Sequence, residues 1–337
     1  MTASSTRSAW AVGNFFSGHE GGRHGAFVER WNGHRWTLLP RRVVPRGSFL
    51  ADVSADSRKD AWIAGYTQGG NVALVKHWNG RRWARTPVPR TARYNHLFAI
   101  DARTPTDVWA VGNSSDGRSG RTLILHWNGE RWHITPSPSP PPAPASGRPY
   151  ATLNAVVATS PDNGWAVGES ANVAPAGQSQ TLVLHWDGRR WSRIASPNLR
   201  NRAGERFDML FSVAAVAGDD VWAAGSWNTQ LPGYGGGGDR SLVEHWNGTR
   251  WRIVPTPAVA GRRILYGIAA GEGDVWTVGD QAEPYRTLIE RRRPGGWLIA
   301  PASAGSLGAI TGAPDGRLWA VGQRDGHTLA LSCATTP

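Results

Sequence analysis

Three carboxylates of this chain stand where they could perform acid–base chemistry. Glu169, Asp208 and Asp280 lie near the ends of apolar, strand-like segments, where a repeated sequence pattern gives way to variable residues. Carboxylates in such places act as general acids and bases in hydrolases and lyases. No two of the three have a diagnostic spacing, and the chain has no nucleophile motif of the Gly-x-Ser-x-Gly type. A carbohydrate-active hydrolase or lyase that uses these carboxylates is therefore our alternative hypothesis.

The histidines and the single cysteine could bind a metal or act as a nucleophile. One position of the repeated pattern is occupied by His77, His126, His185 and His245. Other repeats place Arg or Ser at this position, and ligands supplied one per repeat would lie too far apart to share an ion. We therefore expect hydrogen-bonded structural histidines, a buried and inert thiol at Cys333, and neither a metal nor another cofactor.

Aromatic side chains outside the repeated pattern are candidates for ligand binding. Trp227 and five of the six tyrosines fall in variable segments that we expect to be loops, as do Phe15, Phe16 and Phe207. The tyrosines are Tyr66, Tyr94, Tyr150, Tyr234 and Tyr285. Aromatic faces interleaved with amides and carboxylates suit sugars and extended polar ligands, because the CH faces stack while the hydroxyls find partners. We expect Asn113 and Glu169 to be polar members of the same site.

These residues are positioned by a repeat. A strand-like word close to Trp-Ala-Val-Gly recurs seven times, at intervals of 43 to 57 residues. The seven words begin at Trp10, Trp62, Trp109, Trp165, Trp222, Trp276 and Trp319. A period of this size is the signature of a repeat architecture rather than of several unlike domains. We therefore interpret residues 1–337 as a single domain.

Each repeat predicts four antiparallel strands. In the fourth repeat, residues 153–158 alternate large and small apolar side chains, and a turn-forming cluster separates them from Trp165. Asp187-Gly188 then joins two apolar runs, and an Asx-Gly pair of this kind is the strongest short hairpin signal. Seven such units predict an all-β, seven-bladed β-propeller whose first and last blades are incomplete. The blades are expected at about 1–40, 48–89, 95–138, 151–197, 208–257, 263–301 and 305–333, with a Pro-rich linker at 136–149.

Eighteen of the 19 tryptophans fall at three repeated positions, as Trp109, Trp127 and Trp132 do. A large aromatic that recurs in every unit is expected to pack blade against blade. With its glycine-ended strands and an aromatic on each side of a turn, the chain resembles the kelch-repeat propellers over its whole length. Similar Trp-rich repeats occur in bacterial proteins. The resemblance implies a propeller fold and leaves the activity open.

The repeats differ mainly in two sets of connections. The links from second to third strand and from blade to blade vary widely, and in a propeller both emerge on the same face. A polar ring is expected there, directly after the seven glycine-ended strands: Asn14, Tyr66, Asn113, Glu169, Ser226, Asp280 and Gln323. We therefore favour a non-catalytic binding scaffold, whose carbohydrate or protein ligand lies on the variable-loop face.

Composition limits the other possibilities. The net charge is +12, but only Lys59 and Lys76 are lysines, and many arginines recur at the same turn of each repeat. Charge spread around a rim in this way does not predict a nucleic-acid partner. No apolar run approaches the length of a transmembrane segment. We expect a monomer.

The two ends of the chain are expected to be incomplete. Met1 aligns with Val156 of the fourth repeat, so the first repeat has lost most of its inner strand, and the seventh stops after its third strand. This predicts a three-stranded seventh blade with a weak seam against the first. It also predicts that the natural reading frame starts upstream, and an export signal in that added segment is the accompanying hypothesis. An extracellular or cell-surface location is favoured in that case, and a cytoplasmic one otherwise.

Overall fold

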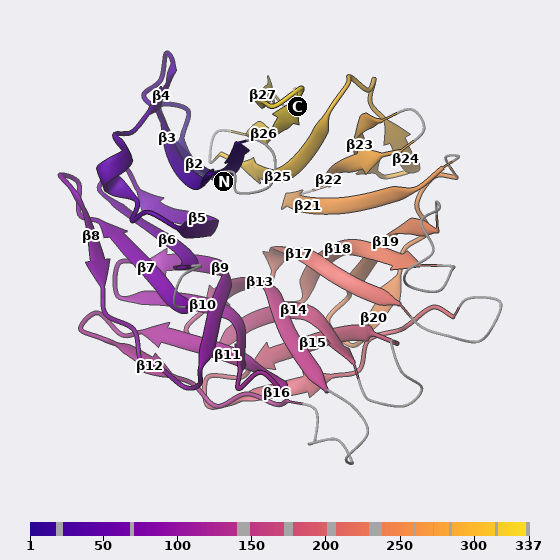
Figure 1. Ribbon diagram of the computed structural model, residues 1–337. Coiled ribbons are helices and arrows are strands. Elements are labelled where there is room, and N and C mark those ends of the chain that lie inside the picture. The colour runs from indigo at the N-terminus through magenta and orange to yellow at the C-terminus, as the bar shows by residue number, and fades with distance from the viewer. Residues whose placement is uncertain are drawn as a thin grey trace.

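The computed structural model is a ring of β-sheets around a central axis (Figure 1). It describes residues 1–17, 23–67, 71–139, 149–171, 178–200, 207–228, 238–258, 261–271, 273–282, 285–313 and 316–334. The single described helix is the three-residue 3-10 turn η1 (Arg41–Val43), so no described helix is long enough to cross a bilayer. The fold is the expected all-β, seven-bladed propeller, and the two ends of the chain lie near each other in Figure 1.

The strands form seven antiparallel sheets, each called a blade and numbered in chain order. Blade 1 contains β1 (Thr2–Ser5), β2 (Ser8–Ser17), β3 (Arg23–Trp31) and β4 (Trp36–Leu38). Blade 2 contains β5 (Ser48–Ser57), β6 (Asp60–Thr67), β7 (Val72–Trp78) and β8 (Trp83–Thr86). Blade 3 contains β9 (Tyr94–Thr104), β10 (Asp107–Ser115), β11 (Gly120–Trp127) and β12 (Trp132–Ile134). Blades 4 and 5 contain β13 (Tyr150–Ser160), β14 (Asn163–Ala171), β15 (Gln180–Trp186), β16 (Trp191–Ile194); and β17 (Asp208–Ala217), β18 (Asp220–Asn228), β19 (Asp239–Trp246), β20 (Trp251–Ile253). Blades 6 and 7 contain β21 (Arg263–Gly271), β22 (Asp274–Gln281), β23 (Arg286–Arg293), β24 (Gly296–Ile299); and β25 (Ser306–Gly312), β26 (Arg317–Arg324), β27 (His327–Ala334).

The turn chemistry fixes the outer hairpin of blades 1 to 5. Gly129 adopts φ +96°, a left-handed conformation that side chains disfavour, and Gly188 adopts φ +85° at the same turn of blade 4. The carboxamide oxygen of Asn128 accepts hydrogen bonds from the backbone N–H groups of Glu130 and Arg131, both at 3.1 Å. Each Asx-Gly pair thus supplies both the unusual backbone conformation and the cap for the turn.

The repeated tryptophans pack blade against blade, as predicted. Trp109 of blade 3 is 2% exposed, and its ring centroid lies 5.1 Å from that of Trp186 and 5.3 Å from that of Trp191, both in blade 4. We call such a set, one indole from one blade and two from the next, a Trp triad. The same arrangement is formed by Trp62 with Trp127 and Trp132 at the preceding seam. Three indoles fill the wedge that two twisted sheets leave between them.

The repeated histidines are structural, also as predicted. His126 stacks on Trp109 with centroids 4.0 Å apart, and its Nε2 lies 2.7 Å from a carboxylate oxygen of Asp107. Equivalent contacts join His77 to Asp60 and His245 to Asp220. Within the part of the chain that the structure describes, no three metal-ligating side chains gather as a metal site would require.

The terminal blades differ from the others. Blade 1 has all four strands, but its inner strand β1 has only four residues and contacts the inner strand of blade 7 sparsely. Blade 7 has three strands among the described residues, as expected. Trp319 completes a Trp triad with Trp31 and Trp36, so the outer half of the seam between blades 7 and 1 has the aromatic packing of other seams. One expectation fails here. Cys333 is exposed rather than buried, because no described fourth strand covers it.

Candidate functional site

A cavity of about 730 Å³ lies on the axis of the ring. Six blades line it with the same structural element, a β-bulge in the inner strand. The bulged residues are Ala51, Phe98, Asn154, Phe211, Tyr266 and Gly308. A bulge inserts one unpaired residue and redirects its side chain, and here it turns that side chain towards the channel.

The bulge also explains the glycine of the repeated word. A Cβ atom added at Gly112 would lie 2.0 Å from the carbonyl oxygen of His96, and one added at Gly65 would lie 2.0 Å from that of Phe49. The leucine after each of these carbonyls, Leu97 or Leu50, is almost fully buried and anchors the inner strand. Only glycine therefore fits opposite the bulge, because the inner backbone approaches too closely for any side chain.

Side chains near the channel tie neighbouring blades together. The Asn14 side-chain amide donates to the carbonyl of Leu50 at 2.7 Å and accepts from its N–H at 2.9 Å. Asn154 donates to the carbonyl of Leu210 at 2.9 Å. Asp52 accepts from the N–H of Ile100 at 3.0 Å, and burial raises the pKa of this carboxyl. These polar groups hold the channel wall in place and leave the aromatic side chains as its contact surface.

An aromatic cluster occupies one side of the channel mouth. The Tyr66 ring stacks on Phe49 with centroids 5.1 Å apart and lies 4.1 Å from the ring of His96. Phe98 meets Tyr66 edge to face at 6.4 Å. Phe49 and Phe98 line the cavity, so the cluster presents a continuous aromatic wall from blades 2 and 3. Burial raises the pKa of Tyr66 and lowers that of His96, which favours neutral side chains there.

A second aromatic pair faces the channel from blades 5 and 6. The rings of Phe211 and Tyr266 lie 5.9 Å apart at an angle of 43°. Burial, with the nearby Asp280 carboxylate, raises the pKa of Tyr266 to about 12, so its hydroxyl remains a hydrogen-bond donor. The Gln323 amide, which lines the cavity from blade 7, donates to the hydroxyl of Tyr285 at 3.2 Å.

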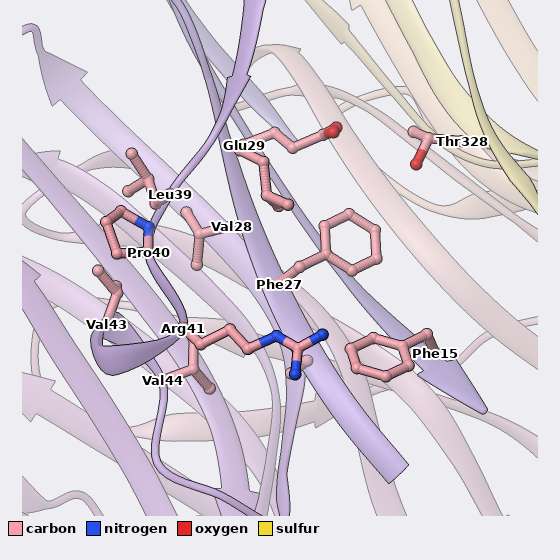
Figure 2. Close-up of a pocket in the computed structure, with 12 residues that line it drawn as sticks. Phe15, Phe27, Val28, Glu29, Leu39, Pro40, Arg41, Val43, Val44 and Thr328 are labelled. Carbon is pink, nitrogen blue, oxygen red and sulfur yellow. The ribbon is translucent and has the colours of Figure 1, made fainter. Parts of the chain in front are cut away.

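From the channel, a groove runs outward over blade 1. Phe15, Phe27, Glu29 and Thr328 line both the channel cavity and a neighbouring pocket of about 210 Å³. Figure 2 shows the two phenylalanine rings between Arg41 and Thr328, with the Arg41 guanidinium extending towards Phe15. Burial raises the pKa of Glu29.

The outer end of this groove is basic. A further pocket, of about 980 Å³, is lined by Phe15 together with Arg41, Arg42 and Arg46, which follow β4 in η1 and the next turn. All three arginines are exposed, and none pairs with a described carboxylate. The channel, the small pocket and the basic pocket form one path, because each shares lining residues with the next. We call this path the channel groove.

The predicted ligand-binding residues are only partly brought together. Tyr66 joins the aromatic cluster, and Tyr285 reaches the channel rim through Gln323. Tyr94, Tyr150 and Asn113 lie in β9, β13 and β10 and do not line the cavity. Tyr234 and the side chain of Phe16 lie outside the described residues, while Phe207 is buried.

Trp227 does not lie in a loop, contrary to our expectation. It belongs to β18, where it pairs with Asp208 of β17 on one side and with Arg240 of β19 on the other. Its side chain packs against the core that blades 4 and 5 share. Tyr66, Tyr94 and Tyr150 are also strand residues. The strands extend two or more residues beyond the repeated glycine because the neighbouring strand continues to pair with them. Sequence variability therefore begins inside the sheets.

The three predicted carboxylates lie in three different blades, in β14, β17 and β22. Glu169 accepts a hydrogen bond from the Tyr150 hydroxyl at 3.0 Å, and burial raises its pKa. Asp208 and Asp280 are buried at 0% and 6% exposure. None of the three lines the channel cavity, whose described carboxylates are Glu29 and Asp52.

Sequence reasoning missed most of the channel lining. Phe49, Phe98, Phe211 and Tyr266 were absent from the predicted site, although all four precede or follow the buried leucine of an inner strand. For Phe98, Phe211 and Tyr266, the available signal was a large residue directly after that leucine, where three other repeats have Ala, Asn or Gly. Reading it required knowledge that this position is bulged.

Comparisons with known proteins support the fold alone. No family model and no curated protein matches the chain. Solved structures resemble it: a family PL25 ulvan lyase (11% identity, TM-score 0.60, covering 97% of this chain and 92% of that one) and a YCF48 structure with a bound D1 peptide (14%, 0.51, 87% and 80%). The GH74 xyloglucanase of Xanthomonas campestris has 15% identity and a TM-score of 0.58, and the likeness covers 96% of this chain but only 53% of the xyloglucanase chain. At such identities the likeness establishes a propeller.

Proposed function

We propose that this kelch-like propeller is a binding module for an acidic polysaccharide, which lies along the channel groove. The observation that carries the proposal is the convergence of aromatic side chains from five blades on one cavity: Phe15, Phe27, Phe49, Phe98, Phe211 and Tyr266. Rigid aromatic faces around a concave mouth suit the CH faces of sugar rings, since stacking there requires little loss of side-chain freedom.

The charge of the groove supports an anionic ligand. Arg41, Arg42 and Arg46 line its outer end beside Phe15. A guanidinium pairs a carboxylate or sulfate with two parallel N–H donors, whereas the aromatic wall contacts the apolar side of the same sugar. A polymer of uronic acids presents both surfaces in every unit. Solved propellers of similar fold include a ulvan lyase and a xyloglucanase, so this scaffold is compatible with glycan ligands.

A hydrolase or lyase acting on the same polymer is the second candidate. The observation that favours it is Glu29, a carboxyl in the channel groove whose pKa is raised by burial, as a general acid requires. Asp52 is a poorer candidate because it already accepts backbone N–H bonds from Ile100 and Val53. Because none of Glu169, Asp208 and Asp280 lines the channel cavity, binding remains the function that we favour.

The test compares polygalacturonate with its methyl ester, which keeps the backbone and removes the charge. We expect the acid to bind more tightly, and Phe98→Ala to weaken the binding of both forms by about tenfold. Leu298→Ala is the control, because Leu298 is 57% exposed on the outer strand β24. Equal affinities of Phe98→Ala, Leu298→Ala and the parent protein would refute a site at the channel mouth.

Two further variants separate the roles within the groove. Arg41→Gln with Arg42→Gln should weaken binding of the acid at low salt and leave the ester unaffected, because only the acid presents charge. New reducing ends released by the parent and not by Glu29→Gln would establish the hydrolase. New unsaturated ends released by the parent and not by Glu29→Gln would establish the lyase. Absence of both products, with binding retained, supports the binding module.

A further inference from the structure

The ring contains one seam whose aromatic packing is interrupted. At five other seams, the Trp of the repeated word lies within about 6 Å of indoles of the next blade. Between blades 5 and 6, Arg292 lies 5.0 Å above the Trp222 ring, and Trp297 packs against the same cluster. Trp276 has neither kind of partner from blade 7, where the corresponding position is Cys333 and no fourth strand is described.

Trp276 borders a cavity instead. The cavity measures about 450 Å³ and is lined by Trp276, Asp274 and Leu318, by alanines and glycines of blades 6 and 7, and by Ala3 of blade 1. Small side chains around a half-buried indole leave open the space that a Trp triad fills at five other seams.

The edge strand of blade 7 is one strand away from this cavity, because Leu318 lines the cavity and pairs with Cys333 of β27, the last described strand. Leu331 of β27 is half-buried, whereas Leu125 and Leu184 at the same position of blades 3 and 4 are fully buried. Ala330, Ser332 and Cys333 are exposed along the same strand. A sheet edge with unpaired backbone groups and exposed apolar surface is a template for another strand.

The other six blades define what fits this edge. Their fourth strands all have Trp as the first or second residue and place Leu, Ile or Arg two residues later: Trp36-Thr-Leu, Trp83-Ala-Arg, Trp132-His-Ile, Trp191-Ser-Arg, Trp251-Arg-Ile and Trp297-Leu-Ile. In blade 3 the strands pair antiparallel, with Trp127 opposite Trp132 and Leu125 opposite Ile134. The N–H after the fourth strand then donates to the carbonyl of Ile124 at 2.9 Å.

We propose that β27 is a docking edge for an extended segment of a partner chain that carries Trp followed two residues later by Ile or Leu. The segment pairs antiparallel with β27 and continues the interface that already joins the other blades. Its Trp faces Cys333 and fills the cavity beside Trp276, while its Ile or Leu faces Leu331. The segment pairs with Leu331 and Cys333 in the second half of β27, whereas Thr328 in the first half lines the channel groove. The proposal does not depend on the proposed polysaccharide ligand.

The probe is a synthetic peptide copied from blade 5, residues 247–255, which contains Trp251 and Ile253. We expect it to slow backbone hydrogen exchange in β27 and to raise the melting temperature of the whole chain. The same peptide with Trp251→Ala is the matched control and should bind at least tenfold more weakly. Trp276→Ala in the protein should weaken the binding of the parent peptide and have little effect on the binding of the control peptide.

A cross-link fixes the register. A peptide with Trp251→Cys places its thiol opposite Cys333, the only cysteine of the chain, and should form a mixed disulfide under mild oxidation. A peptide with Cys one residue later should react much more slowly, because its side chain points to the opposite face. Equal rates for the two peptides, or peptide binding without protection of β27, would overturn the proposal. Protection of β27 by a second copy alone, with concentration-dependent dimerisation and no peptide effect, would also overturn it.

Discussion

Replacement of Glu244 should make the stability of this protein less dependent on pH. The Glu244 side chain is fully buried in β19, at the seam between blades 4 and 5. One carboxyl oxygen accepts a hydrogen bond from the Ser196 hydroxyl at 2.5 Å, and the other has no partner among the described residues. Burial, with the Asp208 carboxylate nearby, raises the Glu244 pKa to about 8. The native protein therefore holds this carboxyl in its neutral form at neutral pH.

The sign and size of the effect follow from proton binding. The unfolded chain loses the Glu244 proton near the usual pKa of 4.5, whereas the native protein keeps it until about pH 8. Between these values the native state binds one more proton, so Glu244 lowers the free energy of unfolding by about 1.4 kcal/mol per pH unit as pH rises. The loss is complete above about pH 8 and amounts to roughly 5 kcal/mol at most.

Glu244→Gln keeps the shape of the side chain and removes its titration. Urea unfolding followed by tryptophan fluorescence between pH 4 and pH 9 should show similar stabilities at the acid end and a more stable variant at the alkaline end. Glu290→Gln should give a smaller gain in stability that is complete at a lower pH, since burial raises the pKa of Glu290 to about 7. Glu130→Gln, at an exposed hairpin, is the control. Parallel pH profiles for the parent and Glu244→Gln would refute the reasoning.

Two other predictions concern the repeat itself. Gly112→Ala should destabilise the protein by about 2 kcal/mol or more, because the new Cβ would meet the His96 carbonyl at 2.0 Å. Gly271→Ala should have little effect, because the space around Gly271 is open. Equal melting temperatures of the two variants would contradict the account of the bulge. Trp109→Ala should lower the free energy of unfolding by about 4 kcal/mol in chemical denaturation, because it removes one indole of a Trp triad. Trp276→Ala should lower the free energy of unfolding clearly less, because Trp276 already borders a cavity. Equal losses would show that the triads add little to stability.

The blade architecture could be predicted because its signals are local and repeated. Asp187-Gly188 identifies an outer hairpin without reference to any other part of the chain, and Gly188 does adopt a positive φ. The packing role of Trp109 could be inferred because only a position common to all blades has the same surroundings in each. The same logic assigned His126 correctly as a structural residue.

The candidate site could be predicted only in part. Tyr66 joins the channel mouth, but Trp227 lies in a strand and packs against the core. The position of a residue relative to the repeated glycine shows where the repeated sequence pattern ends. It does not show where the pairing of the strands ends. Pairing depends on how long the neighbouring strand is, which differs from blade to blade.

The sequence by itself determined the number of blades and the order of strands within each, because hairpin turns and side-chain alternation act over a few residues. The tertiary structure decided which side chains meet. Phe98 and Tyr266 come from strands far apart in the chain, and they face one cavity because each lies on a bulge and because the ring closes. Trp276 borders an open cavity for the complementary reason: its packing partners had to come from the next blade, and the described part of that blade provides none.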